Sequence, residues 1–140
     1  MDTSIFSEMN WLAILVAAVA YFMLGALWYS KALFSNQWIA HHKIDMNDPE
    51  LKKGVGVIMF TSFLLFIVIS ICLGILIERM QLNQVLSGVK LGLLTGVGFS
   101  FAAISITYLY VKKPFSLHLI DGMYHVVGQI LAAIIICLWQ

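Results

Sequence analysis

The sequence predicts an all-α, polytopic integral membrane protein: a bundle of four transmembrane helices in a single domain over residues 1–140, with a short interfacial helix after the first. Two observations predict this class. Four apolar runs follow one another, each of about the 20 residues that cross the hydrocarbon core of a bilayer. Hydrophobic residues make up 61% of the chain and charged residues 11%, whereas a soluble domain carries about a quarter charged residues.

We expect the first helix over residues 10–30, where the apolar run Trp11–Tyr29 follows Asn10. The segment before it contains Asp2 and Glu8 but no lysine or arginine. A secretory signal peptide begins with a basic region. The first run is therefore predicted to be an uncleaved transmembrane helix.

Residues 32–42 are predicted to form a short helix that lies on the cytoplasmic surface of the membrane. Leu33, Phe34, Trp38 and Ile39 fall on one side of this helix, which is the pattern of an interfacial amphipathic segment. Polar and basic residues occupy the other side, which suits contact with water.

The second helix is expected over residues 50–78. Asn47 and Asp48 are good capping residues, Pro49 suits the first helical position, and Glu50 places an acid in the first turn. These signals predict a helix that starts at Pro49, before the membrane. Its interior carries few polar groups, so we expect it to be the most lipid-exposed of the four helices.

The third helix, expected over residues 87–111, carries Gly88, Gly92 and Gly96 at successive four-residue steps. Small residues at this spacing let another helix backbone approach closely. We therefore expect tight packing among the first, third and fourth helices. If the glycine stripe is not used within the chain, it would be the natural interface of a homo-oligomer.

The fourth helix, expected over residues 117–139, has its polar and small residues on one face. These residues are His118, Asp121, Gly122, His125, Gly128, Gln129 and Ala132. They recur at three- and four-residue steps and fill one arc of the helix, opposite an apolar side. Ionisable groups at mid-bilayer cost about 2.5–3.5 kcal/mol, so this arc is predicted to face the bundle interior.

The distribution of basic residues predicts the orientation. Six lysines lie in or beside the first and third connections: Lys31, Lys43, Lys52, Lys53, Lys112 and Lys113. Only Arg79 and Lys90 flank the second connection. Cytoplasmic loops carry the excess of lysine and arginine. Both termini are therefore expected outside the cytoplasm.

Asp121, Tyr124, His125 and Gln129 are the candidate binding or proton-relay residues of the fourth helix, because intramembrane ionisable groups are commonly functional. A structural role is an equal alternative, in which His125 and Gln129 bond to neighbouring helices. Asp121 could equally be a cap, or a residue at headgroup level near the lysines of the third connection.

A compatible stripe on the first helix includes Tyr21, Gly25, Trp28 and Tyr29. These residues are expected to face His125 and its neighbours, with Gly25 and Gly128 as packing positions. For Trp28 and Tyr29 the alternative is an aromatic belt at the membrane interface.

Metal binding is not predicted. His118 and His125 lie about 10 Å apart along a helix axis, so they cannot share one ion without further ligands. The first and third helices supply no histidine, cysteine, aspartate or glutamate. The sequence leaves the identity of any cofactor open.

Composition also argues against two other features. A net charge of +1 gives no basic surface for nucleic acid. The two cysteines, Cys72 and Cys137, are too few for a disulfide framework and are expected to be small buried apolar side chains.

Short motifs resemble a known bacterial family. They are Asn10-Trp11, Gly25-Ala-Leu-Trp-Tyr29, Phe34 with Trp38, and Asp121-Gly-Met-Tyr-His125. Over nearly its whole length the chain is similar to the small inner-membrane family catalogued as domain of unknown function 1761 (DUF1761). The resemblance implies a compact four-helix protein of the bacterial inner membrane with no assigned activity. Ser30-Lys31 stands where many relatives carry Gly-Pro, so a role tied to that turn is in doubt.

Two classes of function fit the sequence, and whether the protein is an enzyme is left open. The first is a homo-oligomeric bundle in the lipid bilayer that binds or moves a small solute, or acts as a membrane assembly partner. The second is a membrane-embedded enzyme or electron carrier that acts on a lipophilic substrate, with Asp121, Tyr124 and His125 as acid-base groups. No complete nucleophile, metal cage or nucleotide-binding motif is present, so the first class is favoured.

Overall fold

Helices make up all the regular secondary structure in residues 4–139, which are the residues that the computed structural model describes. In chain order the elements are α1 (Ile5–Glu8), α2 (Trp11–Trp28), α3 (Ser35–His42), the 3-10 helix η1 (Pro49–Lys52), α4 (Val55–Met80), α5 (Val85–Thr95), the π-helical turn η2 (Gly96–Phe101), α6 (Ala102–Tyr110) and α7 (Phe115–Leu138). The predicted all-α class is confirmed. Asp2, in the segment before the first predicted helix, lies outside the described residues.

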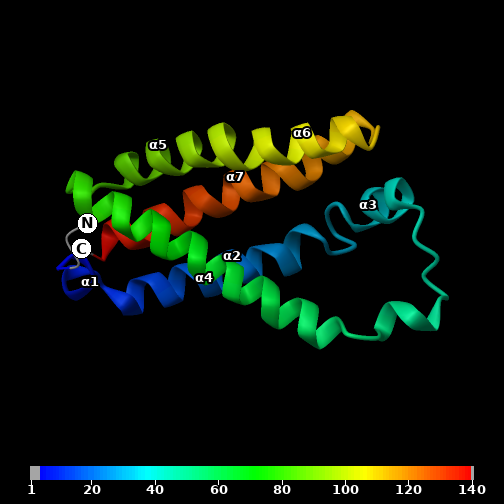
Figure 1. Cartoon of the computed structure of the whole chain (residues 1–140), viewed down its shortest axis with the longest axis horizontal. Coiled ribbons are helices and arrows are strands. Elements are labelled where there is room, and N and C mark those ends of the chain that lie inside the picture. Colours follow the sequence, from blue (N-terminus) through cyan, green and yellow to red (C-terminus); the bar gives the residue numbers. More distant parts are fainter. Residues whose placement is uncertain (1–3, 140) are drawn as a thin grey trace.

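Four helical segments are long and apolar enough to cross a membrane: α2, α4, the continuous segment from α5 to α6, and α7. The protein is therefore an integral membrane protein with four transmembrane helices. The long helices lie side by side, with the start of α2 and the end of α7 at one end of the bundle and α3 at the other (Figure 1). Asn10 joins the start of α2 to the end of α7, because its side-chain amide donates to the backbone carbonyl of Trp139 at 2.9 Å.

The helix α7 is the centre of the bundle and packs against α5, α2 and α4. In its most apolar stretch 56% of the residues are buried, against 22% in both α4 and the α5–α6 segment. The second transmembrane helix, α4, thus shares the lowest buried fraction with the α5–α6 segment, as expected of a lipid-exposed helix. The carboxyl-terminal half of α4 buries Phe66, Ser70, Leu73 and Ile77, and this half holds the helix against α2 and α7.

The glycine stripe of the third transmembrane helix packs within the chain. A methyl group added at Gly88 would lie 2.9 Å from the backbone of Ile134, and one added at Gly96 would lie 2.7 Å from the backbone of Val126. At Gly92 the added carbon would overlap the backbone of Ile130. The absence of side chains therefore allows α5 and α7 to touch backbone to backbone, and the stripe is not free to join two copies of the chain.

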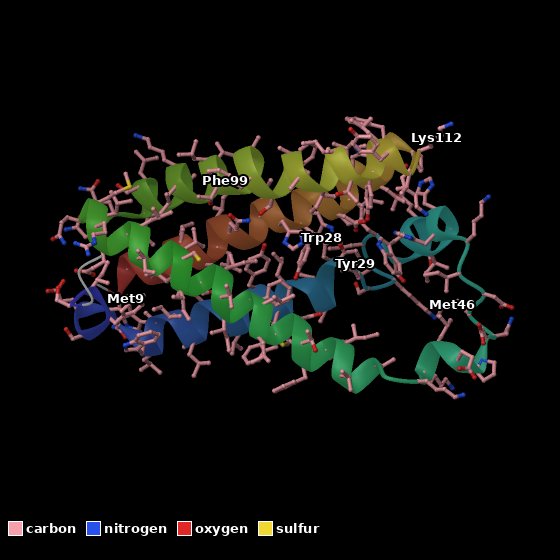
Figure 2. The ribbon with its side chains drawn as sticks, in the orientation of Figure 1. Met9, Trp28, Tyr29, Met46, Phe99 and Lys112 are labelled. Atoms are coloured by element: carbon pink, nitrogen blue, oxygen red, sulfur yellow. The ribbon has the colours of Figure 1, made fainter. Side chains whose placement is uncertain are left out.

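Two predicted helices are interrupted. The second does not run on from Pro49: Pro49–Lys52 is a separate 3-10 helix capped by Asp48, and Gly54, at φ +73°, turns the chain before α4 starts. The third contains the π-helical turn, whose extra residue per turn rotates α6 relative to α5. Phe99 in this turn is 71% exposed and points away from the bundle (Figure 2).

The helix α3 is present but folds over the end of the bundle. Its Trp38 ring lies 5.7 Å from the ring of Tyr29, edge to face. The neighbouring His41 shares a 2.8 Å hydrogen bond with Ser116, at the start of α7. One side of α3, with Trp38, therefore contacts protein, and the position of α3 at the membrane surface stays a prediction.

Both cysteines are free thiols. Cys137 is buried as expected, whereas Cys72 is exposed on α4, contrary to the expectation of two buried side chains.

Candidate functional site

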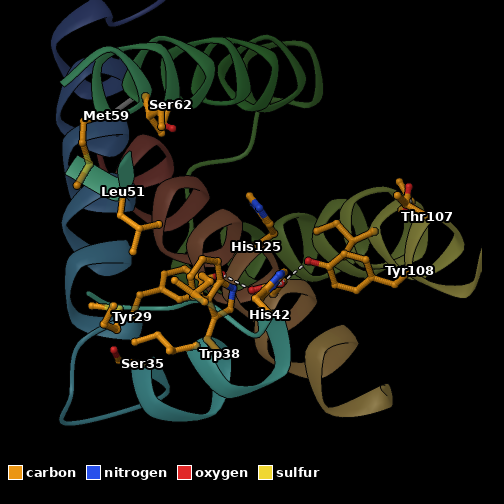
Figure 3. Close-up of a pocket in the computed structure, with 17 residues that line it drawn as sticks. Tyr29, Ser35, Trp38, His42, Leu51, Met59, Ser62, Thr107, Tyr108 and His125 are labelled. Carbon is orange, nitrogen blue, oxygen red and sulfur yellow. Dashed lines mark hydrogen bonds and ion pairs between the residues drawn. The ribbon is translucent and has the colours of Figure 1, made fainter. Parts of the chain in front are cut away.

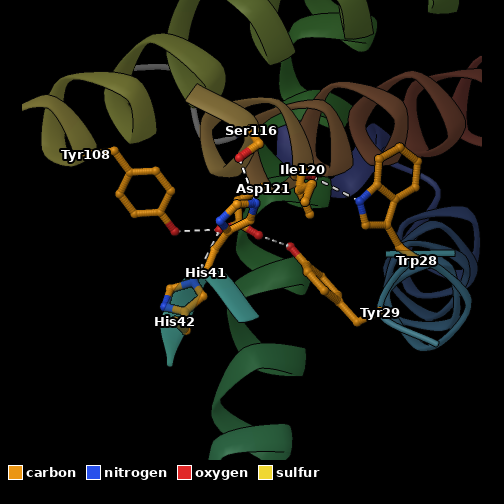
Figure 4. Close-up of polar contacts among 8 residues, drawn as sticks. All are labelled: Trp28, Tyr29, His41, His42, Tyr108, Ser116, Ile120 and Asp121. Carbon is orange, nitrogen blue, oxygen red and sulfur yellow. Dashed lines mark hydrogen bonds and ion pairs between the residues drawn. The ribbon is translucent and has the colours of Figure 1, made fainter. Parts of the chain in front are cut away.

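Asp121 lies near the start of α7 and accepts hydrogen bonds from two tyrosines on other helices (Figure 4). Tyr29, directly after α2, donates to Oδ1 at 2.7 Å. Tyr108, in α6, donates to Oδ2 at 2.5 Å. Asp121 is 8% exposed, so these two hydroxyls replace water as its hydrogen-bond partners. Burial first, and then the hydrogen bond to Asp121, raise the pKa of Tyr29, which keeps its hydroxyl a donor.

His42, at the end of α3, approaches the same carboxylate. Its Nε2 lies 4.0 Å from Asp121 Oδ2 and is buried without a hydrogen-bond partner. The ring stacks on Trp38, with centroids 4.5 Å apart. Four helical segments therefore converge on one carboxylate.

His125 belongs to a second cluster, one turn deeper along α7. Its Nδ1 shares a 2.7 Å hydrogen bond with the hydroxyl of Tyr21, which is completely buried in α2. Tyr124 lies beside it and donates to the backbone carbonyl of Tyr21 at 3.3 Å. The hydrogen bonds of Asp121 and His125 thus go to tyrosines rather than to each other, and the two candidate residues belong to adjacent clusters.

The remaining candidates contribute to packing. Trp28 donates its indole N–H to the backbone carbonyl of Ile120 at 3.0 Å, so it joins α2 to α7. Gln129 bonds to Ser100 at 2.5 Å and joins α7 to the π-helical turn. A methyl group at Gly128 would overlap the ring of Tyr21, and one at Gly25 would lie 2.8 Å from the hydroxyl of Tyr124. These two glycines therefore make room for the tyrosine cluster.

A pocket of about 920 Å³ opens beside Asp121 (Figure 3). The amino-terminal half of α4 lines one side and α6 the other, while α3 and the connection after it close the end nearest His42. Ile58 and Met59, which line this pocket, are 63% and 52% exposed on a transmembrane helix. The pocket therefore opens sideways, toward the region that lipid occupies around the bundle.

A second pocket, of about 820 Å³, lies between α4 and α2. Apart from Tyr29, Ser62, Tyr124 and His125, its lining side chains are apolar or glycine. His125 also lines the first pocket, together with Tyr29, Met59 and Ser62. The two pockets thus flank the amino-terminal half of α4 and meet at His125.

The first pocket carries a single formal charge. Of the residues that line it, Asp121 is the sole aspartate, glutamate, lysine or arginine. No group of three or more potential metal ligands occurs among residues 4–139. The hydroxyl, imidazole and carboxylate groups that line the pocket are suited to hydrogen bonding and proton transfer.

Sequence reasoning missed His42, Tyr108 and Trp38 as site residues. His42 and Trp38 fall in the segment predicted to lie on the membrane surface, and the sequence pattern does not single out Tyr108. One available signal was the four-residue spacing of Trp38 and His42, which places both on the same side of α3.

A family model described as "Protein of unknown function (DUF1761)" matches residues 12–137, nearly the whole chain. No curated protein and no solved structure matches it. The motifs that carried the resemblance include Tyr29, Asp121 and His125, which line the pockets. The chain thus belongs to the DUF1761 family of membrane proteins of unknown function.

Proposed function

We propose that this protein binds a small lipophilic molecule that enters from the bilayer, with its polar group at Asp121 and His125 and its apolar part along α4. One observation carries the proposal: a buried polar cluster opens into two apolar pockets whose mouth lies on a transmembrane surface. Concave, mostly apolar pockets with a few polar groups are typical of small-molecule sites.

The bacterial inner membrane is the proposed location, with both termini outside the cytoplasm. The lysine-rich connections support this orientation. The pocket and α3 would then lie in the cytoplasmic half of the bundle. Homo-oligomerisation remains a prediction, but the glycine stripe no longer supports it, because α7 already occupies that surface.

The test is ligand retention after purification. Ser62 lines both pockets, and Ser62→Trp should fill the space where they meet. The neighbouring Thr61 is exposed and lines neither pocket, so Thr61→Trp is the matched control. We expect mass spectrometry of extracted lipids to find a species enriched over the bulk membrane in the wild type and Thr61→Trp, and lost in Ser62→Trp. Identical lipid profiles in all three would refute the proposal.

The second candidate is a membrane-embedded enzyme or electron carrier for a lipophilic substrate. It is supported by the position of His125, which holds a hydrogen bond to Tyr21 and lines both pockets. An acid-base role requires such a group within reach of the substrate. This candidate predicts that the purified protein converts a component of a membrane lipid extract and that His125→Gln does not. An unchanged extract with the wild type would count against it.

A further inference from the structure

The charge in the first pocket indicates which head group it prefers. Asp121 is a buried carboxylate whose two close partners, Tyr29 and Tyr108, are neutral hydroxyl donors. No lysine or arginine lines the pocket. A buried charge is costly unless a charge of opposite sign compensates it, so the pocket is set up for a cation.

From this geometry we infer that the ligand is an amphipathic amine whose protonated nitrogen binds Asp121 and whose hydrocarbon chain lies against α4. This inference rests on the proposed binding function. The carboxylate has about four lone-pair positions, and the two tyrosines use two, so acceptors remain for ammonium N–H groups.

The surroundings of the carboxylate fit the same head group. Tyr29, Trp38 and Tyr108 line the pocket, and aromatic rings attract cations through their faces. The unpartnered Nε2 of His42 lies 4.0 Å from Asp121 Oδ2. A nitrogen at about 2.9 Å from the carboxylate oxygen can lie at the same distance from this atom, which would supply its missing hydrogen bond.

An anionic head group fits the pocket poorly. It would meet Asp121 as a like charge in a poorly hydrated site, and no lysine or arginine lines the pocket to compensate it. A neutral alcohol could donate to the carboxylate but would leave the charge uncompensated. The expected order of affinity is therefore amine, alcohol, carboxylate.

The experiment compares the binding of dodecylamine, dodecanol and dodecanoate in micelles of an uncharged detergent, measured by isothermal titration calorimetry. We expect the amine to bind the wild type about tenfold more tightly than the alcohol, because hydrogen bonds between charged groups are stronger than neutral ones. Asp121→Asn should remove this preference while the alcohol still binds, which also shows that the variant is folded.

Glu78→Gln is the matched control, because it neutralises a carboxylate that lines neither pocket and lies near the end of α4. Glu78→Gln should keep the full preference for the amine. Asp121→Glu, which keeps a carboxylate, should retain part of the preference that Asp121→Asn loses. Equal binding of amine and alcohol to the wild type, or an unchanged preference in Asp121→Asn, would overturn the amine inference and leave the binding function standing. No saturable binding of any of the three compounds would overturn both.

Discussion

At the scale of single residues, the ionisable groups of this membrane bundle form hydrogen bonds with tyrosine hydroxyls. Tyr29 and Tyr108 donate to Asp121, and Tyr21 shares a hydrogen bond with His125. A hydroxyl can satisfy a buried polar group without adding a second charge to the apolar interior, which lowers the cost of keeping that group in the membrane. The same hydroxyls orient the carboxylate and the imidazole toward the pockets.

The bond between Tyr21 and His125 gives the first prediction. Tyr21→Phe removes the hydroxyl and keeps the ring, so the variant should lose about 0.6 kcal/mol of stability, and at most about 1.7, as for other hydrogen bonds between membrane helices. The measurement is the free energy of unfolding in mixed detergent micelles. Tyr110→Phe is the control, because Tyr110 is 86% exposed, and equal losses in both variants would contradict the assignment.

At the scale of elements, α5 and α7 pack backbone to backbone, whereas Gly98 in the π-helical turn has open space where a side chain would start. Gly92→Ala should therefore force the two helices apart and destabilise the protein by about 1–3 kcal/mol. Gly98→Ala adds the same methyl group and should be nearly neutral. Thermal unfolding in detergent checks this pair, and similar melting temperatures would show that the stripe does not hold α5 against α7.

The attachment of α3 gives a second prediction at this scale. The hydrogen bond between His41 and Ser116 ties α3 to the start of α7. His41→Ala should loosen α3, because few other contacts hold it, and amide hydrogen exchange over residues 35–42 should rise. Lys43→Ala, just beyond the helix, is the control. Unchanged exchange in His41→Ala would mean that the stacking of Trp38 on Tyr29 suffices.

At the scale of the whole molecule, the bundle has one tight end and one open end. Near Asn10 and Trp139 the helices are joined, and the carboxyl-terminal half of α4 is packed. Toward α3, the amino-terminal half of α4 stands away from its neighbours and leaves a pocket on each side (Figure 1). This asymmetry puts the polar clusters within reach of molecules that diffuse in the bilayer.

The proposed orientation is tested at the same scale. If the lysine-rich connections face the cytoplasm, a reporter fused after Gln140 should be active only when it is a periplasmic enzyme such as alkaline phosphatase. A cytoplasmic reporter such as a fluorescent protein, fused at the same position, should stay dark. The reverse result would place the open end, with Asp121 and α3, on the opposite side of the membrane.

The sequence by itself determined the class, the number of transmembrane helices and the interior face of α7. Length and hydropathy suffice for the first two, because only helices of about 20 apolar residues cross a bilayer in this class. The three- and four-residue spacing of Asp121, His125 and Gln129 suffices for the third. These properties depend on residues close together in the chain.

The tertiary structure alone decided which partners these residues have. Periodicity shows that Asp121 faces the interior, but not that Tyr108 and His42 reach it. Those contacts depend on the π-helical turn, which rotates α6, and on the fold of α3 over the bundle end. The break at Gly54 and the divergence of α4 likewise create the pockets. Packing between residues far apart in the chain sets these features, and such packing leaves no periodic trace in the sequence.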